Sequence, residues 1–419
     1  MTEYHRLVDR QFRELSRGYG GAEAVTILRN SRLSKHLLLL RFIARAWPGP
    51  PAEREAALSA LADAQAQNRA AVDEILADPI VGAWAARTCR RILASVYVDV
   101  DLGHLGAIAA AAATRCGSDA DVLTPARDGF VMLPTVGAVA VNAARHQPVR
   151  VRVRSGEVSV EHEAGAWYRV RRLRSGDAGY AVVLEDTDPY RGGHHVAPAG
   201  RLTDAEFDDW QELFAEAWRL LTTYAPERAD EIAVGLRTLV PLVHGAPGSA
   251  DSATMRDAFG AFGLTRPESG TSLALTIVHE FQHSKLSAIV DLMRLYDAKA
   301  PDTYFAPWRE DPRPVGGLYQ GTYAFLAVAD MWHRLRTAPD GRAAAEHQFA
   351  AARVQVDAAL TTLLELSSLT ALGRRFTNGM RSTLDALHAI EVPDAVLVRA
   401  QEELRRNRVA WQERNGRAP

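Results

Sequence analysis

The spacing of apolar residues changes twice along the chain, and this change limits the choice of folds more than any other feature of the sequence. From residue 3 to about 120, apolar residues recur every three or four positions, as at Leu7, Phe12 and Leu15, which predicts amphipathic helices. From Gly129 the period becomes two, and Gly-containing turns separate the alternating runs, which predicts β-hairpins of an antiparallel sheet. Helical spacing returns after residue 200. The sequence therefore predicts a mostly helical α+β fold with a β-rich middle.

The two changes of period divide the 419 residues into three predicted regions. We expect an N-terminal helical region over 1-125, an antiparallel β-rich region over 126-200, and a C-terminal helical region over 201-419 that carries the chemistry. Two or three subdomains are expected for this length, since one domain takes roughly 150 residues. Thr203, followed by Asp204-Ala205-Glu206, is typical of a helix N-cap at the start of the third region.

Charge and cysteine content narrow the setting of the protein. A formal net charge of -2 gives no general attraction to nucleic acid or anionic membranes, so neither is an expected partner. The two cysteines, Cys89 and Cys116, are too few for a disulfide framework. The start of the sequence has no apolar signal-peptide core, and no apolar run reaches membrane-spanning length. We therefore expect a cytoplasmic protein, and the strong preference for arginine over lysine suggests a bacterial source.

The segment LTIVHEFQHSKL, residues 275–286, contains the pattern H-E-x-x-H. At about 100° per residue, His279 and His283 lie about 40° apart on one helix face, so both imidazoles can reach a single ion. Glu280 lies about 60° from His283, on the flank of the same face. Burying these groups in an apolar helix without partners is costly, and metal binding removes that cost. The motif predicts a metal site, and the alternative is a pair of hydrogen-bonded core histidines.

This pattern is typical of zinc peptidases, in which the glutamate acts as general base toward a zinc-bound water. One known form has Gly and His three and six residues after the second histidine, but this chain has Leu286 and Ile289 there. Another form needs a glutamate on a following helix, but the next glutamate here is Glu310, in a Pro-rich loop. The missing third ligand weakens the peptidase interpretation.

A second unusual stretch, WREDPRP at residues 308–314, follows the motif helix. Its prolines stiffen the chain, and Arg309 and Arg313 are suited to bind a small carboxylate. The alternative is a surface loop with internal salt bridges. Two histidines and one carboxylate are the ligand set of non-haem iron(II) oxygenases, whose keto-acid co-substrate needs a cation to anchor its distal carboxylate. Asp311 is the first candidate for the third ligand, and the alternatives are Glu280, Gln320 and His333.

A known family resembles this part of the chain: the H-E-x-x-H peptide-modification family found beside, or fused to, radical-SAM peptide maturases in clusters for ribosomally made peptides. The matching stretches are HEFQHSK, Asp291-Leu292, APWREDPRP and GGLYQGTYAFLAVADMW. The resemblance is most specific over 266–333 and extends across the helical half from about residue 200. Many members have a histidine where this chain has Phe325, so the resemblance supports no ligand role at that position.

The resemblance implies iron(II)- and 2-oxoglutarate-dependent β-hydroxylation of a residue in a precursor peptide, on a fold unlike the double-stranded β-helix. Fe(II) would be bound by His279 and His283, and Asp311 is the first candidate for the third ligand. The carboxylate of 2-oxoglutarate would be held by Arg309 and Arg313. The motif glutamate would act beside the metal, orienting a histidine or an iron-bound water. O2 is the second co-substrate, and proteolysis is not implied.

The expected partners are the precursor peptide and a radical-SAM maturase encoded nearby. Two alternatives to the oxygenase stay open: a zinc metallopeptidase of the H-E-x-x-H type, with Zn as the metal, and a non-catalytic peptide-maturation scaffold that keeps the motif for its structure. A separate pair, His194-His195, lies in a Gly-rich loop, where adjacent histidines are expected to be exposed to solvent.

Overall fold

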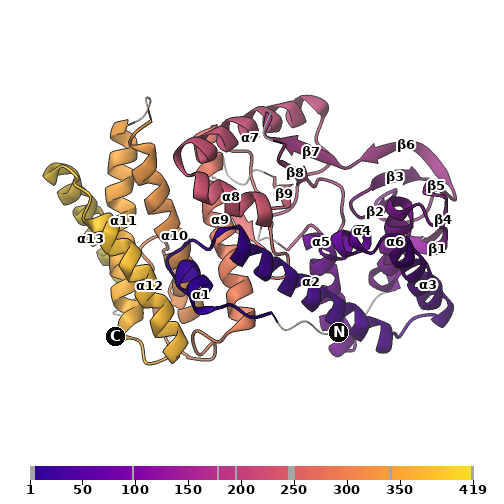
Figure 1. The fold of residues 1–419 in the computed structure, drawn as a ribbon, viewed down its shortest axis with the longest axis horizontal. Coiled ribbons are helices and arrows are strands. Elements are labelled where there is room, and N and C mark those ends of the chain that lie inside the picture. Colours follow the sequence, from indigo (N-terminus) through magenta and orange to yellow (C-terminus); the bar gives the residue numbers. More distant parts are fainter. Residues whose placement is uncertain are drawn as a thin grey trace. The chain divides into compact units, whose positions relative to one another are not determined.

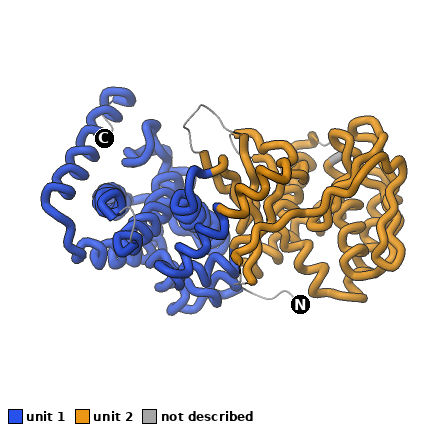
Figure 2. Tube along the Cα trace, turned by 90° about the horizontal axis from the view of Figure 1, so that it is seen from above, with its two compact units in different colours: residues 1–28, 213–235, 267–419 blue, residues 29–212, 236–266 orange. Residues whose placement is uncertain are grey.

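The computed structural model describes residues 5–96, 99–176, 179–193, 196–243, 251–338 and 342–416, so the pair His194-His195 lies outside the described residues. The chain forms two compact units, which Figure 2 shows in different colours. Unit 1 consists of Met1–Leu28, Leu213–Gly235 and Pro267–Pro419, and unit 2 consists of Arg29–Glu212 and Leu236–Arg266. The units do not coincide with the three regions of secondary structure, because the N-terminal helices are divided between them.

Unit 1 is built mainly from helices. Its shorter helices are α1 (Asp9–Ser16) and α8 (Pro226–Gly235), and its long ones are α9 (Gly270–Leu292), α10 (Val315–Leu335), α11 (Arg342–Glu365), α12 (Ala371–His388) and α13 (Asp394–Asn415). Helix α10 packs against α9, α11 and α12 (Figure 1). A two-stranded ribbon, β12 (Thr303–Tyr304) and β13 (Arg313–Pro314), precedes α10.

The first and last parts of unit 1 pack together although they are far apart in the sequence. The Phe12 ring of α1 meets the Phe376 ring of α12 edge to face, with centroids 5.7 Å apart. The Tyr323 hydroxyl of α10 donates a hydrogen bond to the Leu15 carbonyl, 2.7 Å away. The core of unit 1 therefore requires chain segments more than 300 residues apart.

The described residues of unit 2 form helices and three sheets. Its helices are α3 (Pro51–Gln67), α4 (Arg69–Leu76), α5 (Pro79–Leu93) and α6 (Asp99–Cys116), while α2 (Gly21–Arg45) and α7 (Asp204–Tyr224) contribute residues to both units. The Ala-rich α6 packs against β1 (Ala120–Pro125) and α3, and its run of Ala109 to Ala113 is fully buried. Alanine has no bulky side chain, so helix and sheet can approach closely.

The predicted hairpins are present in two antiparallel sheets. The first has the order β1-β4-β5, with β4 (Pro148–Arg154) and β5 (Glu157–Val160), and the second has the order β2-β3-β6, with β2 (Phe130–Leu133), β3 (Gly137–Val141) and β6 (Glu163–Arg169). Ser155 and Gly156 both have positive φ, as the tight turn between β4 and β5 requires. Along β4, exposed arginines alternate with buried valines, as expected for a sheet with one solvated face.

The third sheet of unit 2 is mixed and has the order β10-β11-β9-β8-β7. Its strands are β7 (Arg171–Arg174), β8 (Ala181–Leu184), β9 (Thr238–Pro241), β10 (Ser252–Thr254) and β11 (Ala261–Leu264). β8 runs parallel to β9 because the long connection through α7 and α8 returns the chain to the same end of the sheet. The alternating pattern of the middle region predicts antiparallel hairpins and does not indicate this parallel pairing.

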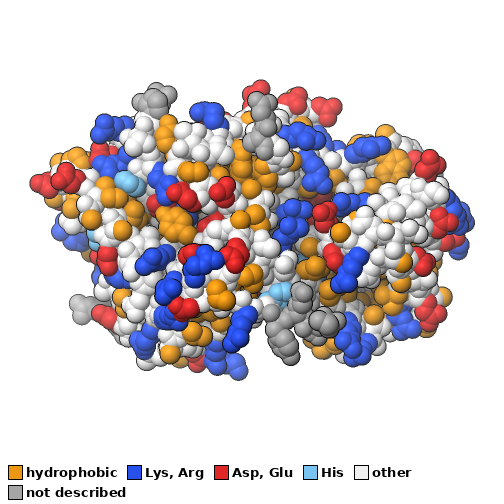
Figure 3. Space-filling model, in the orientation of Figure 1, with side chains coloured by type: hydrophobic (Ala, Val, Ile, Leu, Met, Phe, Trp, Pro, Cys, Tyr) orange, Lys and Arg blue, Asp and Glu red, His pale blue; other side chains and the backbone are white. Residues whose placement is uncertain are grey.

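The order of helices, strands and helices confirms the predicted mostly helical α+β fold, and the separate small sheets form no double-stranded β-helix within the described residues. The predicted start of α7 is also confirmed, because Thr203 and Glu206 form a reciprocal capping box. No described helix combines the length and apolar character needed to cross a membrane. On the face drawn in Figure 3, acidic and basic side chains are interspersed, in keeping with the small net charge.

Candidate metal centre

Helix α9 places the two motif histidines side by side in unit 1, where both side chains are partly buried. Its N-cap is Ser269, whose side chain accepts a hydrogen bond from the Ser272 amide at 3.1 Å. Most of the helix is buried in the protein, including apolar side chains such as Leu273, Ile277 and Leu286. A buried helix with a fixed start holds the motif side chains in one rotational position.

The two histidine side chains point toward one another. The Nε2 atoms of His279 and His283 lie 3.1 Å apart. Two nitrogens that each lie about 2.1 Å from one ion can be at most about 4.2 Å apart, so this separation fits two ligands of a single metal ion. Burial holds the pKa of His279 well below its usual value, and His283 lowers it further. A neutral imidazole is the form that binds a metal.

Gln320, on α10, fixes the orientation of His283. Its side-chain oxygen accepts a hydrogen bond from Nδ1 of His283 at 3.0 Å, and its amide nitrogen donates to the Ser287 hydroxyl at 3.2 Å. Because the proton of His283 then resides on Nδ1, its Nε2 lone pair faces His279. Metal-binding histidines usually have such a partner on the other ring nitrogen. The sequence indicates Gln320 only as an alternative ligand, whereas in the structure it makes this orienting contact.

Aromatic rings connect the histidine pair to the WREDPRP loop. The Phe325 ring of α10 meets the His279 ring edge to face, with centroids 5.0 Å apart, and stacks on Trp308 at 4.6 Å. Trp308 can lie against α10 because position 321 is glycine, where an added Cβ would be 2.4 Å from the indole. Phe325 carries no ligand atom and closes one side of His279.

The loop arginines form ion pairs with the carboxylate between them. Nε of Arg309 donates to one oxygen of Asp311 at 2.8 Å, and Nη1 of Arg313 donates to the other at 3.0 Å. These hydrogen bonds hold the pKa of the Asp311 carboxyl below its usual value, and the bond from Arg309 has the largest effect. The side chains of Arg309 and Asp311 remain about half exposed. The loop therefore contains internal salt bridges, as the alternative interpretation of a surface loop predicts.

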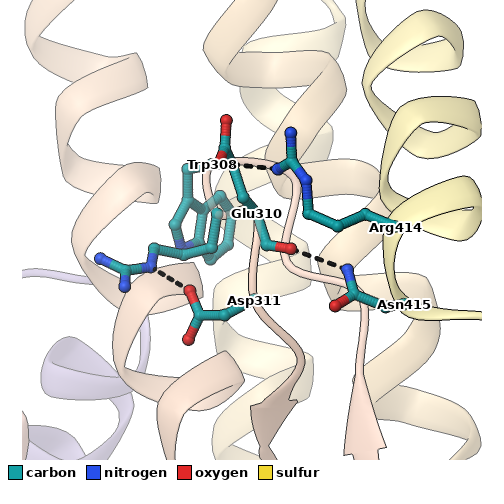
Figure 4. A pocket seen from close by; sticks show the side chains of 6 residues that line it. Trp308, Glu310, Asp311, Arg414 and Asn415 are labelled. Carbon is teal, nitrogen blue, oxygen red and sulfur yellow. Dashed lines mark hydrogen bonds and ion pairs between the residues drawn. The ribbon is translucent and has the colours of Figure 1, made fainter.

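An open pocket of about 530 Å³ lies beside these residues (Figure 4). Its lining includes Arg309 and Asp311 from the loop and Arg414 and Asn415 from α13. Arg414 pairs with Glu310 at 2.7 Å, and the Asn415 amide donates to the Glu310 carbonyl at 2.8 Å. The end of α13 thus holds the loop in place. No local pattern in the sequence indicates this contact, since Glu310 and Asn415 are 105 positions apart.

The structure brings His279 and His283 together, but it does not bring a third predicted ligand to them. Among the residues it describes, no three His, Cys, Asp or Glu side chains form a group that could hold a metal ion. Asp311 pairs with the arginines, and Glu280 is a buried side chain on the flank of α9. His333 lies thirteen residues after Gln320 on α10, about 20 Å along the helix axis. The identity of the third ligand stays a prediction.

The opposite side of α9 carries a buried ion pair between Lys285 and Glu231, which no pattern in the sequence indicates. Nζ of Lys285 is fully buried, lies 2.5 Å from Glu231 of α8, and donates to the carbonyls of Gly18 and Tyr19 at 3.2 and 3.3 Å. The Gly21 amide donates to the same glutamate at 3.1 Å. These hydrogen bonds and the ion pair therefore connect the turn before α2 to α9, the helix that carries the histidines.

No protein-family model matches the sequence, and no curated protein matches it significantly.

Replacing Gln320 with alanine is expected to weaken metal binding about 10- to 100-fold, because His283 loses the partner that fixes its tautomer. Gln320→Glu keeps an acceptor oxygen and should retain most of the affinity. Co(II) titration followed by visible absorption measures the effect, and exposed Gln348 of α11 provides a matched alanine control. An unchanged affinity for Gln320→Ala would show that this contact does not position a ligand.

Proposed function

We propose that the protein is an iron(II)- and 2-oxoglutarate-dependent oxygenase that hydroxylates the β-carbon of a residue in a ribosomally synthesised precursor peptide. The observation that carries the proposal is the pair of imidazole nitrogens 3.1 Å apart, connected through Phe325 and Trp308 to a loop with two arginines. Two histidine ligands that leave positions open suit non-haem iron(II) chemistry. The resemblance over 266–333 favours the same class of enzyme.

The residues of the chain have distinct tasks in this proposal. His279 and His283 hold the ion as neutral imidazoles, and Gln320 keeps the proton of His283 on Nδ1. Arg309 offers a half-exposed guanidinium at the open pocket to the distal carboxylate of 2-oxoglutarate, in competition with Asp311. Bound Fe(II) supplies O2 activation coupled to decarboxylation of 2-oxoglutarate.

The decisive experiment needs no peptide. Anaerobic addition of Fe(II) and 2-oxoglutarate is expected to give a weak visible charge-transfer band, and exposure to O2 should give slow formation of succinate. Co-expression with a neighbouring precursor peptide should then give a mass increase of one oxygen atom. Tight stoichiometric zinc binding without the band or succinate would contradict the oxygenase proposal.

The same experiment separates the two alternatives. In a zinc peptidase the motif glutamate must reach a metal-bound water. Glu280 is only 2% exposed, and in the described part of the chain it forms no three-residue metal group with the histidines. Cleavage of the co-expressed peptide by zinc-loaded protein would favour the peptidase. Unaltered peptide that copurifies with the protein would favour the non-catalytic scaffold.

Replacing Arg309 with glutamine is expected to raise the 2-oxoglutarate concentration for half-maximal succinate formation about 10- to 100-fold, as loss of one charged hydrogen bond does. Co(II) affinity should stay within about twofold of the wild type, because no histidine contact changes. Arg399→Gln on α13, where the arginine is 68% exposed, is the control. An equal loss in both variants would remove Arg309 from the proposed co-substrate site.

Replacing Asp311 with asparagine tests the predicted third ligand. If Asp311 binds the ion, the variant should lose Co(II) affinity at least about 10-fold, as expected for loss of a ligand. Asparagine keeps one of the two acceptor oxygens, so one of the two arginine hydrogen bonds is retained, and circular dichroism establishes that the variant is folded. An affinity equal to that of the wild type would assign Asp311 to the salt bridges of the loop alone.

A further inference from the structure

The sheet β2-β3-β6 in unit 2 is apolar on both faces. Val131, Leu133 and Val139 point to one face and belong to the buried core. Side chains alternate along a strand, so Phe130 and Met132 point to the other face, where Met132 lies opposite Ala138 and Ala138 lies opposite Tyr168. Phe130 is 36% exposed and Tyr168 is 37% exposed. A sheet with one face on the core normally carries polar residues on the other, so this second apolar face needs a different explanation.

A pocket of about 370 Å³ opens on this second face. Phe130, Met132 and Tyr168 supply apolar lining, and the two aromatic rings meet edge to face with centroids 5.5 Å apart. Arg201 lies over the Tyr168 ring, 5.7 Å from its centroid. The volume and the mixture of aromatic walls with a few polar groups are those of small-molecule sites. All of these residues belong to unit 2.

Three arginines give the pocket an excess of positive charge. The lining contains Arg127, Arg191 and Arg201, with Asp128 and Asp186 as the acidic residues. Asp186 is shared by two guanidiniums, Arg201 at 2.6 Å and Arg171 at 2.5 Å. The buried Asp101 beside Arg127 is likewise shared, with Arg91 at 2.8 Å.

Of the three lining arginines, Arg191 has the charge that nearby carboxylates neutralise least. It donates to the backbone carbonyls of Asp188 and Ala199, at 2.6 and 2.8 Å. Burial raises the pKa of the Asp188 carboxyl to about 8, and Glu185 adds to this rise, so Asp188 offers little negative charge at neutral pH. In the described structure, the Nε–H groups of Arg191 and Arg127 are buried and have no acceptor. With Arg91 and Arg171, which share Asp101 and Asp186, the three lining arginines therefore outnumber the carboxylates Asp101, Asp128 and Asp186.

We infer that this pocket binds an apolar, preferably aromatic, group that carries a carboxylate. The apolar body would lie against Phe130, Met132 and Tyr168, and the carboxylate would meet the arginines at the rim. The ligand chemistry could come from a free organic acid or from an extended peptide with an aromatic residue two positions from an acidic one. The inference does not rest on the proposed function, because every residue in it lies in unit 2 and none belongs to the metal centre.

The test uses the full chain and the fluorescent probe 8-anilinonaphthalene-1-sulfonate, an aromatic body with one anionic group. We expect one site per chain, with affinity reduced at least about 10-fold by Phe130→Ser, which removes an aromatic wall. Arg191→Gln should reduce it by a similar factor, since a charged hydrogen bond contributes about 1.5 to 3 kcal/mol. The uncharged analogue N-phenyl-1-naphthylamine should bind about 10-fold more weakly and should not respond to Arg191→Gln. Circular dichroism establishes that each variant is folded.

Controls and competitors complete the test. Leu93→Ser and Arg87→Gln change exposed residues of α5 and should leave probe affinity within about twofold. Displacement of the probe by 3-phenylpropionate supports a free acid, and displacement by the blocked peptide Ac-Gly-Phe-Gly-Glu-Gly-NH2 supports a peptide. Displacement by neither would overturn the assignment of a carboxylate ligand. Probe affinity unchanged in both pocket variants would overturn the site itself.

Discussion

Replacing His279 with alanine is expected to lower the affinity for Fe(II), or for Co(II) as a spectroscopic substitute, by more than about 100-fold. The variant loses one of two imidazole nitrogens that converge within 3.1 Å, and a lost ligand should cost more than a lost outer partner such as Gln320. Anaerobic calorimetry and the visible absorption of the Co(II) complex measure the change. Succinate formation should fall to background in the same variant.

His388→Ala is the matched control, because this histidine is exposed on α12. It should leave metal affinity and thermal stability close to those of the wild type. The opposite result for His279→Ala, with metal affinity retained and stability lowered, would mean that the two histidines form only a structural hydrogen bond. That outcome would remove the basis of every metal-dependent function considered for this chain.

Replacing Lys285 with methionine is expected to lower the free energy of unfolding by about 3 to 5 kcal/mol. The reason is that Glu231 would then be a buried carboxylate without its ammonium partner, and the carbonyls of Gly18 and Tyr19 would each lose a donor. Urea denaturation, followed by far-ultraviolet circular dichroism, measures the loss. The exposed residue Lys299 is the control, and Lys299→Met should change stability by less than about 0.5 kcal/mol.

A double variant distinguishes two causes of the lost stability, the uncompensated charge of Glu231 and the lost packing of Lys285. Glu231→Gln removes the charge and keeps an acceptor for the Gly21 amide. Lys285→Met combined with Glu231→Gln should therefore be more stable than Lys285→Met alone by at least about 1 kcal/mol. Equal stabilities would show that the uncompensated charge is not the cause of the destabilisation.

The parts of the fold that depend on neighbouring residues could be predicted from the sequence. The capping box at Thr203 and the turn at Ser155 follow from short-range backbone chemistry. The convergence of His279 and His283 follows from helical spacing alone. The class of fold followed from the same kind of information, because apolar periodicity reports the secondary structure that buries one face.

The parts that depend on distant residues could not be predicted in this way. The division into two units depends on contacts such as that of Lys285 with Gly18, which are 267 positions apart. Similarly, Gln320 meets His283 because α10 packs against α9, and spacing within one helix contains no information about that packing. The expectation for Asp311 rested on the ligand set of a chemical class, whereas its position in the structure is set by two arginines in its own loop.

The contact between α1 and α12 has a consequence for the order in which the protein can fold during synthesis. Helix α1 leaves the ribosome well before its aromatic partner Phe376, which is made more than 350 residues later. At about 5 to 20 residues per second, α1 waits tens of seconds before its packing surface exists. Unit 2, whose segments end at Arg266, can be completed during that interval. Folding factors that cover apolar helices should therefore act on α1 rather than on the β-rich middle of the chain.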